Sequence, residues 1–213
     1  MYLPKHFEQH DPLALQTLMR ERSLATVVSV VDGDITANHI PLVFDASAGE
    51  HGILRGHVAR ANPLWLAAQS SAVLAIFQGA QAYISPSWYP SKATTHKVVP
   101  TWNYAVVQAR GPLVVLDDAT AARALVTRLT ERHEATQARP WAVADAPDDY
   151  VNGMLHAIVC IEIPLSTLVG KYKLSQNRSA ADQGGVVASL RGDRTASSDL
   201  LARWMESPDG ETA

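Results

Sequence analysis

Strands that follow one another through short connections are the feature that most limits the fold of this chain. Residues 24–31 are rich in β-branched side chains, which is typical of a buried strand, and residues 35–44 return after the turn-forming sequence at 32–34. Residues 53–58 are expected to form a third strand. Strands and helices do not alternate regularly, so a doubly wound parallel sheet is not expected. The pattern predicts a mainly β fold, an antiparallel barrel with peripheral helices.

The rest of the chain adds further strands and several helices to this barrel. Strands are expected at residues 72–77 and 82–85, separated by a break at Gln78-Gly79, and at residues 98–116 and 157–163. Helices are expected to begin at Asp11-Pro12, at Asn62-Pro63 and at Asp117 or Asp118, and to fill residues 147–156. Two helical patches, 186–190 and 198–205, flank Gly192-Asp193 and precede a frayed tail at 208–213. We expect one compact domain, 1–178, with 179–213 as a C-terminal helical segment packed on it or appended to it.

Composition and charge exclude several classes of protein. Of the 213 residues, 47% are hydrophobic and 18% are charged, which is typical of a folded chain rather than a disordered one. A net charge of -3 counts against a dedicated nucleic-acid binder. The single cysteine, Cys160, excludes an intramolecular disulfide and any zinc site built on cysteines. No run approaches the roughly 18 to 20 apolar residues of a membrane span, and residues 1–7 lack a signal-peptide core. We therefore expect a cytoplasmic protein that does not bind membranes.

Two stretches near the first strands have the residues of a ligand site. Asn38-His39-Ile40-Pro41-Leu42 lies inside an expected strand, and its proline cannot donate to a ladder, which places it at an edge or a bulge. Backbone groups there are free to meet a ligand, although an ordinary edge strand explains the pattern equally well. Residues 56–63 run from a strand end to a helix N-terminus, and Arg60 adds a fork that suits a phosphate. A capped helix beside a solvated arginine is the alternative.

Two later stretches combine aromatic, proline and amide side chains. Residues 82–92 pack three aromatic residues among prolines and serines, which suits a flat ligand or, alternatively, a proline-rich loop on the core. Residues 98–104 contain Pro100 and Trp102, and residues 171–178 end in Gln176, Asn177 and Arg178. This run of donors suits the carbonyls, ring nitrogens or phosphate of a cofactor. It is equally compatible with a helix entry capped by Asn177.

In this order, the four stretches resemble the PaiB-like family of FMN-binding split-barrel proteins. The resemblance covers residues 1–178 and is most specific at 57–63, 83–89, 99–104 and 175–178. It implies a six-stranded antiparallel split β-barrel with C-terminal helices, similar to flavin reductases and pyridoxine-phosphate oxidases. It also implies a homodimer with FMN bound at the subunit interface.

The motifs and the resemblance together predict which residues bind the cofactor. The resemblance places residues 35–42 beside the isoalloxazine ring and places the phosphate at Arg60 and its neighbours. Asn38, Ser85 or Asn103 could hydrogen-bond the ring edge, and Trp88 or Trp102 could form a wall. No catalytic residue and no metal ligand is assigned. The predicted cofactor-binding residues are Asn38, His39, Ile40, Pro41, His57, Ala59, Arg60, Asn62, Ser85, Trp88, Thr101, Trp102, Asn103, Gln176 and Arg178.

Several functions fit these residues. By resemblance, the first is a flavin-dependent or flavin-sensing transcriptional regulator, and the second is a flavin oxidoreductase with an unknown small-molecule substrate. The third is a haem-binding or haem-degrading protein, for which the candidate axial ligands are His6, His10, His39, His57 and His156. Direct DNA binding has weak support, because acidic residues offset Arg191, Arg194 and Arg203 in the C-terminal helical patches.

Overall fold

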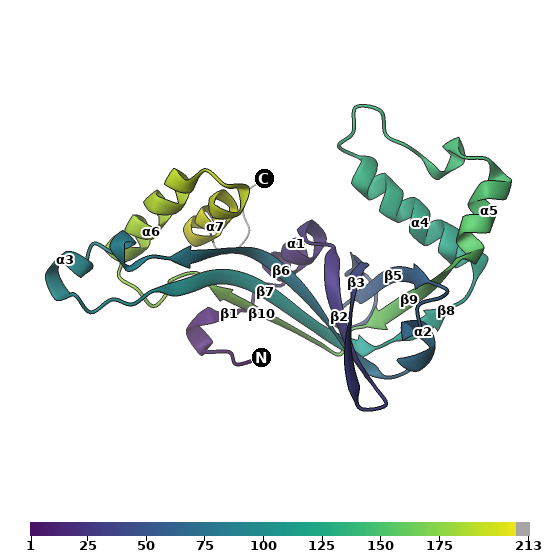
Figure 1. Ribbon diagram of the computed structural model, residues 1–213, viewed down its shortest axis with the longest axis horizontal. Helices are drawn as coiled ribbons and strands as arrows, with labels where there is room; N and C mark the ends of the chain where they lie inside the picture. The colour runs from purple at the N-terminus through teal and green to yellow at the C-terminus, as the bar shows by residue number, and fades with distance from the viewer. Residues whose placement is uncertain (208–213) are drawn as a thin grey trace. The chain divides into compact units, whose positions relative to one another are not determined.

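The computed structural model describes residues 1–207 and has a mainly β architecture with two antiparallel sheets (Figure 1). The six-stranded sheet has the order β1-β10-β7-β6-β2-β3, and the four-stranded sheet has the order β4-β5-β9-β8. The strands are β1 (Glu8–Gln9), β2 (Leu24–Val31), β3 (Asp34–Pro41), β4 (Val43–Asp45), β5 (Ile53–Ala59), β6 (Ala72–Ile84), β7 (Thr101–Pro112), β8 (Val114–Leu116), β9 (Ile158–Pro164) and β10 (Thr167–Lys173). The helices are α1 (Pro12–Glu21), α2 (Leu64–Ala67), α3 (Lys92–Thr95), α4 (Ala119–Glu134), α5 (Asp148–His156), α6 (Ala180–Asp193) and α7 (Ala196–Glu206). Short 3-10 turns are η1 (Lys5–Phe7), η2 (Pro86–Trp88) and η3 (Val143–Asp145). The predicted mainly β class with peripheral helices is confirmed.

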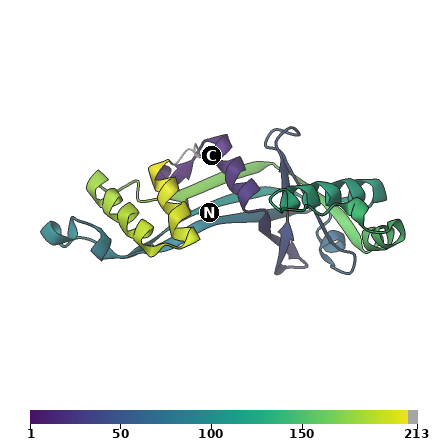
Figure 2. The ribbon, with the colours of Figure 1, turned by 90° about the horizontal axis from the view of Figure 1, so that it is seen from above.

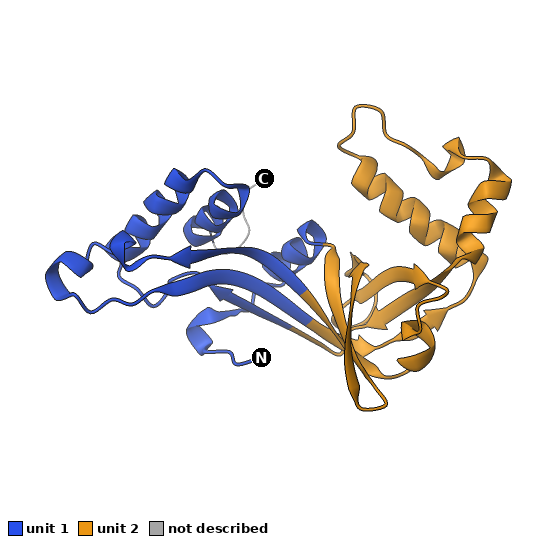
Figure 3. Ribbon diagram, in the orientation of Figure 1, with its two compact units in different colours: residues 1–22, 77–108, 169–213 blue, residues 23–76, 109–168 orange. Residues whose placement is uncertain are grey.

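The chain divides into two compact units (Figure 3). Unit 1 contains residues 1–22, 77–108 and 169–213, and unit 2 contains residues 23–76 and 109–168. Strands β6 and β7 continue from one unit into the other. This division does not test the expected boundary at residue 178, which stays a prediction. The predicted frayed tail at 208–213 lies outside the described residues.

A hairpin begins unit 2 and places β3 at the end of its sheet. β2 and β3 pair antiparallel over their full length, from Leu24 opposite Pro41 to Val31 opposite Asp34. The predicted second strand is divided, because Pro41 has no N–H for a ladder and the next N–H, that of Leu42, bonds the carbonyl oxygen of Ser23 at 2.8 Å. The chain then continues as β4, which pairs with β5 instead.

The β5–β9 pair is the centre of the second sheet and supports two helices. Its register runs antiparallel from Ile53 opposite Pro164 to Ala59 opposite Ile158. Helix α4 begins where Asp118 accepts a hydrogen bond from the Ala121 N–H at 2.7 Å, as one of the two predicted caps. Helices α4 and α5 pack on β9. The residues buried there form one hydrophobic core: Val43, Ala122, Leu125, Leu129, Val143, Val151, Leu155 and Cys160. Cys160 is therefore a buried, free cysteine.

In unit 1, the predicted break at Gln78-Gly79 is wrong. β6 is continuous from Ala72 to Ile84, and Gly79 lies inside it with an ordinary negative φ. A Cβ on Gly79 would lie 2.6 Å from Cη2 of Trp204 in α7, so the glycine makes room for an indole ring and does not end the strand.

Two strands of unit 1 were not predicted. β10 follows the last expected strand after a short connection, and β1 pairs with it through Glu8 opposite Lys171. β1 has only two residues, and the alternation in β10 is interrupted by consecutive buried residues, so neither has a clear period. α6 and α7 contain the two predicted helical patches and lie side by side in unit 1 (Figures 1 and 2). Within residues 1–207, no helix has both the length and the apolar character needed to cross a membrane.

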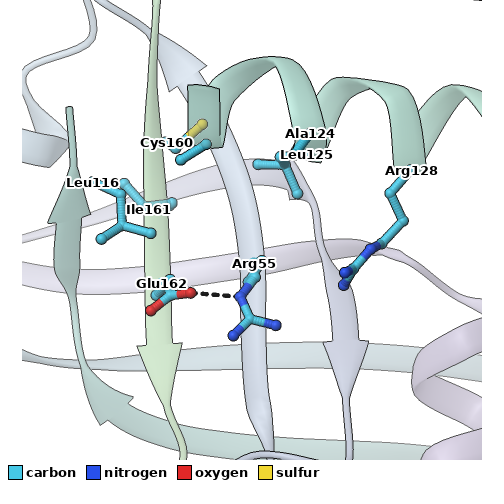
Figure 4. Close-up of a pocket in the computed structure, with 9 residues that line it drawn as sticks. Arg55, Leu116, Ala124, Leu125, Arg128, Cys160, Ile161 and Glu162 are labelled. Carbon is cyan, nitrogen blue, oxygen red and sulfur yellow. Dashed lines mark hydrogen bonds and ion pairs between the residues drawn. The ribbon is translucent and has the colours of Figure 1, made fainter. Parts of the chain in front are cut away.

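An arginine joins three elements on one face of the second sheet of unit 2. Arg55 of β5 forms ion pairs with Glu162 of β9 and with Asp45 of β4. Figure 4 shows this guanidinium at a hollow of about 180 Å³ whose wall also includes Arg128 and Cys160. Hydrogen bonds from the Ser47 hydroxyl and N–H, together with Arg55, lower the pKa of Asp45 to about 2.

A substitution of Gly111, near the end of β7, can test how tightly unit 2 is packed. A Cβ on Gly111 would overlap the backbone carbonyl oxygen of Pro164, which cannot move without distorting the end of β9. We expect Gly111→Ala to lower the free energy of unfolding by about 1 to 3 kcal/mol, the usual cost of overpacking. Gly153→Ala is the matched control, because nothing lies within 4 Å of that position in α5, and it should raise stability by about 0.5 to 1 kcal/mol. Chemical denaturation checks both, and equal effects of the two changes would contradict this packing.

The Asp45 network predicts an acid-sensitive part of the stability. Because the folded-state pKa of Asp45 is about 2 and its ordinary value is 3.8, the carboxylate stabilises the fold fully above the ordinary value. This contribution is lost as the pH falls from about 4 to about 2. Denaturation midpoints measured across that range should fall more steeply for the wild type than for Asp45→Asn. Parallel curves for the two proteins would show that Asp45 does not carry this effect.

Candidate functional site

The predicted cofactor-binding residues fall into two groups, one in each unit. The group in unit 2 lies on β3, on β5 and in the turn before α2: Asn38, His39, Ile40, Pro41, His57, Ala59, Arg60 and Asn62. The group in unit 1 lies around η2, on β7 and after β10: Ser85, Trp88, Thr101, Trp102, Asn103, Gln176 and Arg178. The structure brings residues together within each group.

In unit 2, an amide pair joins β3 to the turn before α2. The Nδ2 of Asn62 donates to the Oδ1 of Asn38 at 2.8 Å, while the Oδ1 of Asn62 accepts from the Leu64 N–H at 2.9 Å. The Asn62 N–H also bonds the carbonyl oxygen of Ala59 at 2.8 Å, which closes the turn. His39 is exposed on β3, whereas the neighbouring Ile40 is buried. The pair orients Asn38, whose Nδ2 has no protein acceptor within residues 1–207.

The environment of Arg60 differs from the predicted phosphate fork. Two guanidinium nitrogens donate to the carboxylate of Asp117 at 2.7 and 3.0 Å, and two further bonds reach the carbonyl oxygens of His156 and Ile158 at 2.8 and 3.1 Å. This ion pair raises the pKa of Arg60 and lowers that of Asp117. Four of the five N–H donors of a guanidinium are thus used within unit 2. The geometry gives no support to a phosphate at Arg60, and that role stays a prediction.

His57 lies on the wall of an apolar pocket of unit 2. Within residues 1–207 its Nδ1 is buried without a hydrogen-bond partner, and burial lowers the pKa of the ring, so the neutral form is favoured. The pocket has a volume of about 290 Å³ and a largely apolar wall that includes the exposed Trp141, Tyr150 and Met154. This hollow was not predicted, because its wall comes from helices that carry no recognisable motif.

In unit 1, the two predicted tryptophan walls have different environments. Trp102 is 54% exposed and meets the ring of Tyr83 edge-on, with 6.1 Å between the ring centroids. Trp88 is half-buried, and its carbonyl oxygen leaves no room for a Cβ at Gly185 of α6. Ser85 caps η2 by accepting from the Ser87 N–H at 3.3 Å. Trp102 therefore offers a free aromatic face, and Trp88 is part of the contact with α6.

The amide side chains of unit 1 are used within the fold. Asn103 is fully buried, and its Nδ2 donates to the Ser175 hydroxyl at 2.9 Å. Gln176 accepts from the Leu174 N–H at 2.7 Å and donates to the carbonyl oxygen of Tyr172 at 2.5 Å. These bonds hold Ser175 at a φ of +65°, a conformation that few residues other than glycine adopt. Asn103 and Gln176 hold the turn after β10, and the predicted contact of Asn103 with a ring edge gains no support.

A pocket of about 160 Å³ lies beside this turn, and we call it the Lys173 pocket. Its wall contains these residues: Phe7, Tyr89, Val99, Pro100, Thr101, Asn103, Lys173, Ser175, Asn177 and Arg178. Lys173 and Tyr89 were not among the predicted residues. The signals for them were present in the sequence, because Lys173 ends the run Lys171-Tyr172-Lys173 and Tyr89 belongs to the aromatic motif at 83–89.

A family model described as "Putative FMN-binding domain" matches residues 1–167, which is more than three quarters of the chain. The chain belongs to this FMN-binding domain family. Among its curated relatives is the Protease synthase and sporulation protein PAI 2 of Bacillus subtilis, 32% identical over 207 residues, with 97% of each chain covered. An uncharacterized protein of Emericella nidulans, AN0679, is 32% identical over 238 residues, with 95% of each chain covered. The predicted resemblance to PaiB-like proteins is confirmed.

Solved structures show that this member of the FMN-binding domain family shares the fold of known flavoproteins. The flavocytochrome Anf3 of Azotobacter vinelandii has a TM-score of 0.55 at 11% identity, over 80% of this chain and 72% of that chain. The FAD and heme binding protein of Mycobacterium smegmatis has a TM-score of 0.53 at 16% identity, over 79% of this chain and 74% of that chain. At such identities the likeness concerns the fold, and the predicted split-barrel class is confirmed.

Because Arg60 and Asp117 form an ion pair, substitutions of the two residues should have non-additive effects on the melting temperature. Arg60→Met removes the ion pair and two bonds to carbonyl oxygens, whereas Asp117→Asn weakens the ion pair alone. We expect Arg60→Met to lower the melting temperature more than Asp117→Asn does. The double variant should have the same melting temperature as Arg60→Met alone, because both changes act on one interaction. Arg123→Met, whose ion pair with Asp148 spans 3.8 Å, is the control and should change little. Additive effects in the double variant would contradict the pairing.

Proposed function

We propose that this protein binds FMN and acts as a flavin-dependent or flavin-sensing regulator. The flavin is supported by membership of the FMN-binding domain family, and FMN in particular by the family's description. The regulatory role is supported by the similarity, over nearly the whole chain, to the sporulation protein PAI 2 of Bacillus subtilis. When bound, FMN supplies hydride and single-electron transfer, so the part of the protein is binding and orientation.

The observation that carries the proposal is the uncovered state of β3. β3 is the last strand of its sheet, and side chains from Asp34 to Ala37 are exposed on both of its faces, including Ile35 at 77%. A strand with a free edge and two open faces presents backbone donors and acceptors together with apolar surface. Those are the groups that a planar ring with polar edges can use.

Asn38 provides a polar contact at the end of this surface. Its Oδ1 is held by Asn62, while its Nδ2 is free of protein acceptors within residues 1–207. A fixed amide with a free N–H suits a carbonyl or a ring nitrogen at a flavin edge, so the residues present fit the group. Within this proposal Asn38 orients the ring, and Asn62 is the positioning residue that holds Asn38.

We further propose that a second copy of the chain covers β3 and completes the flavin site, and that the protein is cytoplasmic. The exposed Ile35 supports a covering surface, because long edge strands with apolar side chains rarely stay open to water. DNA contact by α6 and α7 gains no support, since Arg191 is paired with Glu206 at 2.7 Å and with Asp199 at 3.9 Å. Nothing in residues 1–207 favours the haem or oxidoreductase alternatives over the proposed role, and both stay predictions.

Absorption spectra and FMN titration of the purified chain test the proposal. We expect a flavin spectrum, either as purified or after addition of FMN, and Asn38→Ala should weaken FMN binding by roughly 2- to 12-fold, the worth of one hydrogen bond. Asn152→Ala is the matched control, because Asn152 also makes one side-chain bond, to Arg123 at 3.0 Å, and lies on α5.

Three outcomes contradict parts of this proposal. A folded protein that stays colourless and does not take up FMN overturns flavin binding. A Soret band on haemin addition, without flavin uptake, favours the haem alternative instead. Light scattering that finds a monomer both with and without FMN removes the second copy from the site.

A further inference from the structure

The Lys173 pocket of unit 1 has two cations in its wall, Lys173 and Arg178. Burial lowers the pKa of Lys173, and so does repulsion from the charges of Lys171 and Arg178. Among residues 1–207, none of the three forms an ion pair. The carboxylate of Asp182 interacts electrostatically with Arg178, and its two oxygens accept hydrogen bonds from the Ser91 N–H and hydroxyl at 3.0 and 2.9 Å.

Lys173 and Arg178 are fixed in place by neutral groups. The Nζ of Lys173 donates to the Thr101 hydroxyl and to the carbonyl oxygen of Trp102, each at 2.5 Å, which leaves its third N–H for another acceptor. The guanidinium of Arg178 lies 5.0 Å from the ring centroid of Tyr89, and within residues 1–207 no hydrogen bond or ion pair holds its side-chain donors. Both cations are therefore oriented before any anion arrives, and the carboxylate of Asp182 offsets part of the charge of Arg178.

The Tyr89 hydroxyl is an independent observation that points to a ligand. The side chain is only 2% exposed, and within residues 1–207 its hydroxyl is buried without a hydrogen-bond partner, although the residue forms part of the pocket wall. Buried hydroxyl groups in folded proteins are nearly always hydrogen-bonded, so an unpartnered one requires an explanation. A ligand atom that accepts from this hydroxyl provides one.

The size of the pocket limits what it can hold. About 160 Å³ is room for a few water-sized groups, given roughly 30 Å³ for each water. A tetrahedral phosphate fits this volume, whereas drug-sized ligands occupy pockets of roughly 300 Å³ or more. Ser175, at a φ of +65°, borders the same pocket, and strained residues concentrate at binding sites.

We propose that the Lys173 pocket binds the phosphate monoester group of a small molecule, with Lys173, Arg178 and the Tyr89 hydroxyl as its donors. Two cations and a neutral hydroxyl match a dianion with several acceptor oxygens better than a flat carboxylate with two. The phosphate can belong to the flavin or to a second molecule, and the experiment separates these sources. The proposal does not depend on flavin binding, because inorganic phosphate tests it directly.

Isothermal titration of the full chain with inorganic phosphate, at constant ionic strength set by chloride, is the decisive measurement. We expect saturable binding that Lys173→Met weakens by roughly 10- to 100-fold, the effect of losing a charged hydrogen bond. Tyr89→Phe should weaken it by roughly 2- to 12-fold and leave the melting temperature without phosphate unchanged or higher, because the hydroxyl has no partner to lose. Lys92→Met and Tyr150→Phe, at exposed positions, are the matched controls and should bind as the wild type does.

Competition identifies the source of the phosphate. If FMN displaces phosphate and riboflavin does not, the group belongs to the flavin. If phosphate binds equally well to protein saturated with FMN, the pocket serves a second phosphorylated molecule, and either result supports the proposal. The proposal is overturned if phosphate binds no better than chloride, if acetate binds as tightly as phosphate, or if Tyr89→Phe folds and binds phosphate with unchanged affinity.

Discussion

The antiparallel register between β5 and β9 is the constraint on which the rest of unit 2 depends. It places Arg55 opposite Glu162 and His57 opposite Cys160, so an ion pair and the half-buried position of the His57 ring follow from one alignment. The ladder continues beyond the strands, since the Arg60 N–H bonds the carbonyl oxygen of Ala157 at 2.8 Å. A shift of one residue would turn every one of these side chains to the opposite face. The position of Arg60 beside Asp117 is thus a consequence of strand pairing.

Arg55 and Arg60 of unit 2 have partners of a different kind from those of Lys173 and Arg178 in unit 1. In unit 2, Arg55 and Arg60 each contact at least one carboxylate, and they connect strands to each other or to the start of α4. Among the described residues of unit 1, Lys173 and Arg178 are held by hydroxyl, carbonyl and aromatic groups, and neither forms an ion pair with a carboxylate. An arginine that is already paired stabilises a fold, whereas an oriented cation without a partner attracts an anion. For this reason we propose the anion site at Lys173 and Arg178 and not at Arg60, the residue that the motif at 57–63 singled out.

Much of the fold followed from local patterns. The hairpin of β2 and β3, the start of α1 at the N-cap Asp11 and Pro12, and the two C-terminal helices are all determined by neighbouring residues, and they were predicted. The mistakes share one physical cause. From its neighbours in sequence, Gly79 was predicted to end a strand. The glycine is instead required because the indole ring of Trp204, which is distant in sequence, occupies the position of a Cβ. The partner of Asn103, Ser175, is also distant in sequence, and the predicted contact of Asn103 with a ring edge stays a prediction.

The sequence by itself determined the family, the antiparallel β class and the short list of motifs from which a site is built, because these depend on residue type and order. Only the tertiary structure decided which of those residues still have free donors. Among residues 1–207, Asn38 keeps an amide N–H without a protein acceptor, whereas Arg60 uses four of its five donors within unit 2. The tertiary structure also placed Tyr89 and Lys173 in one pocket. The reason is that hydrogen-bonding capacity is a property of a side chain together with its partners, and those partners lie on segments that only folding brings together.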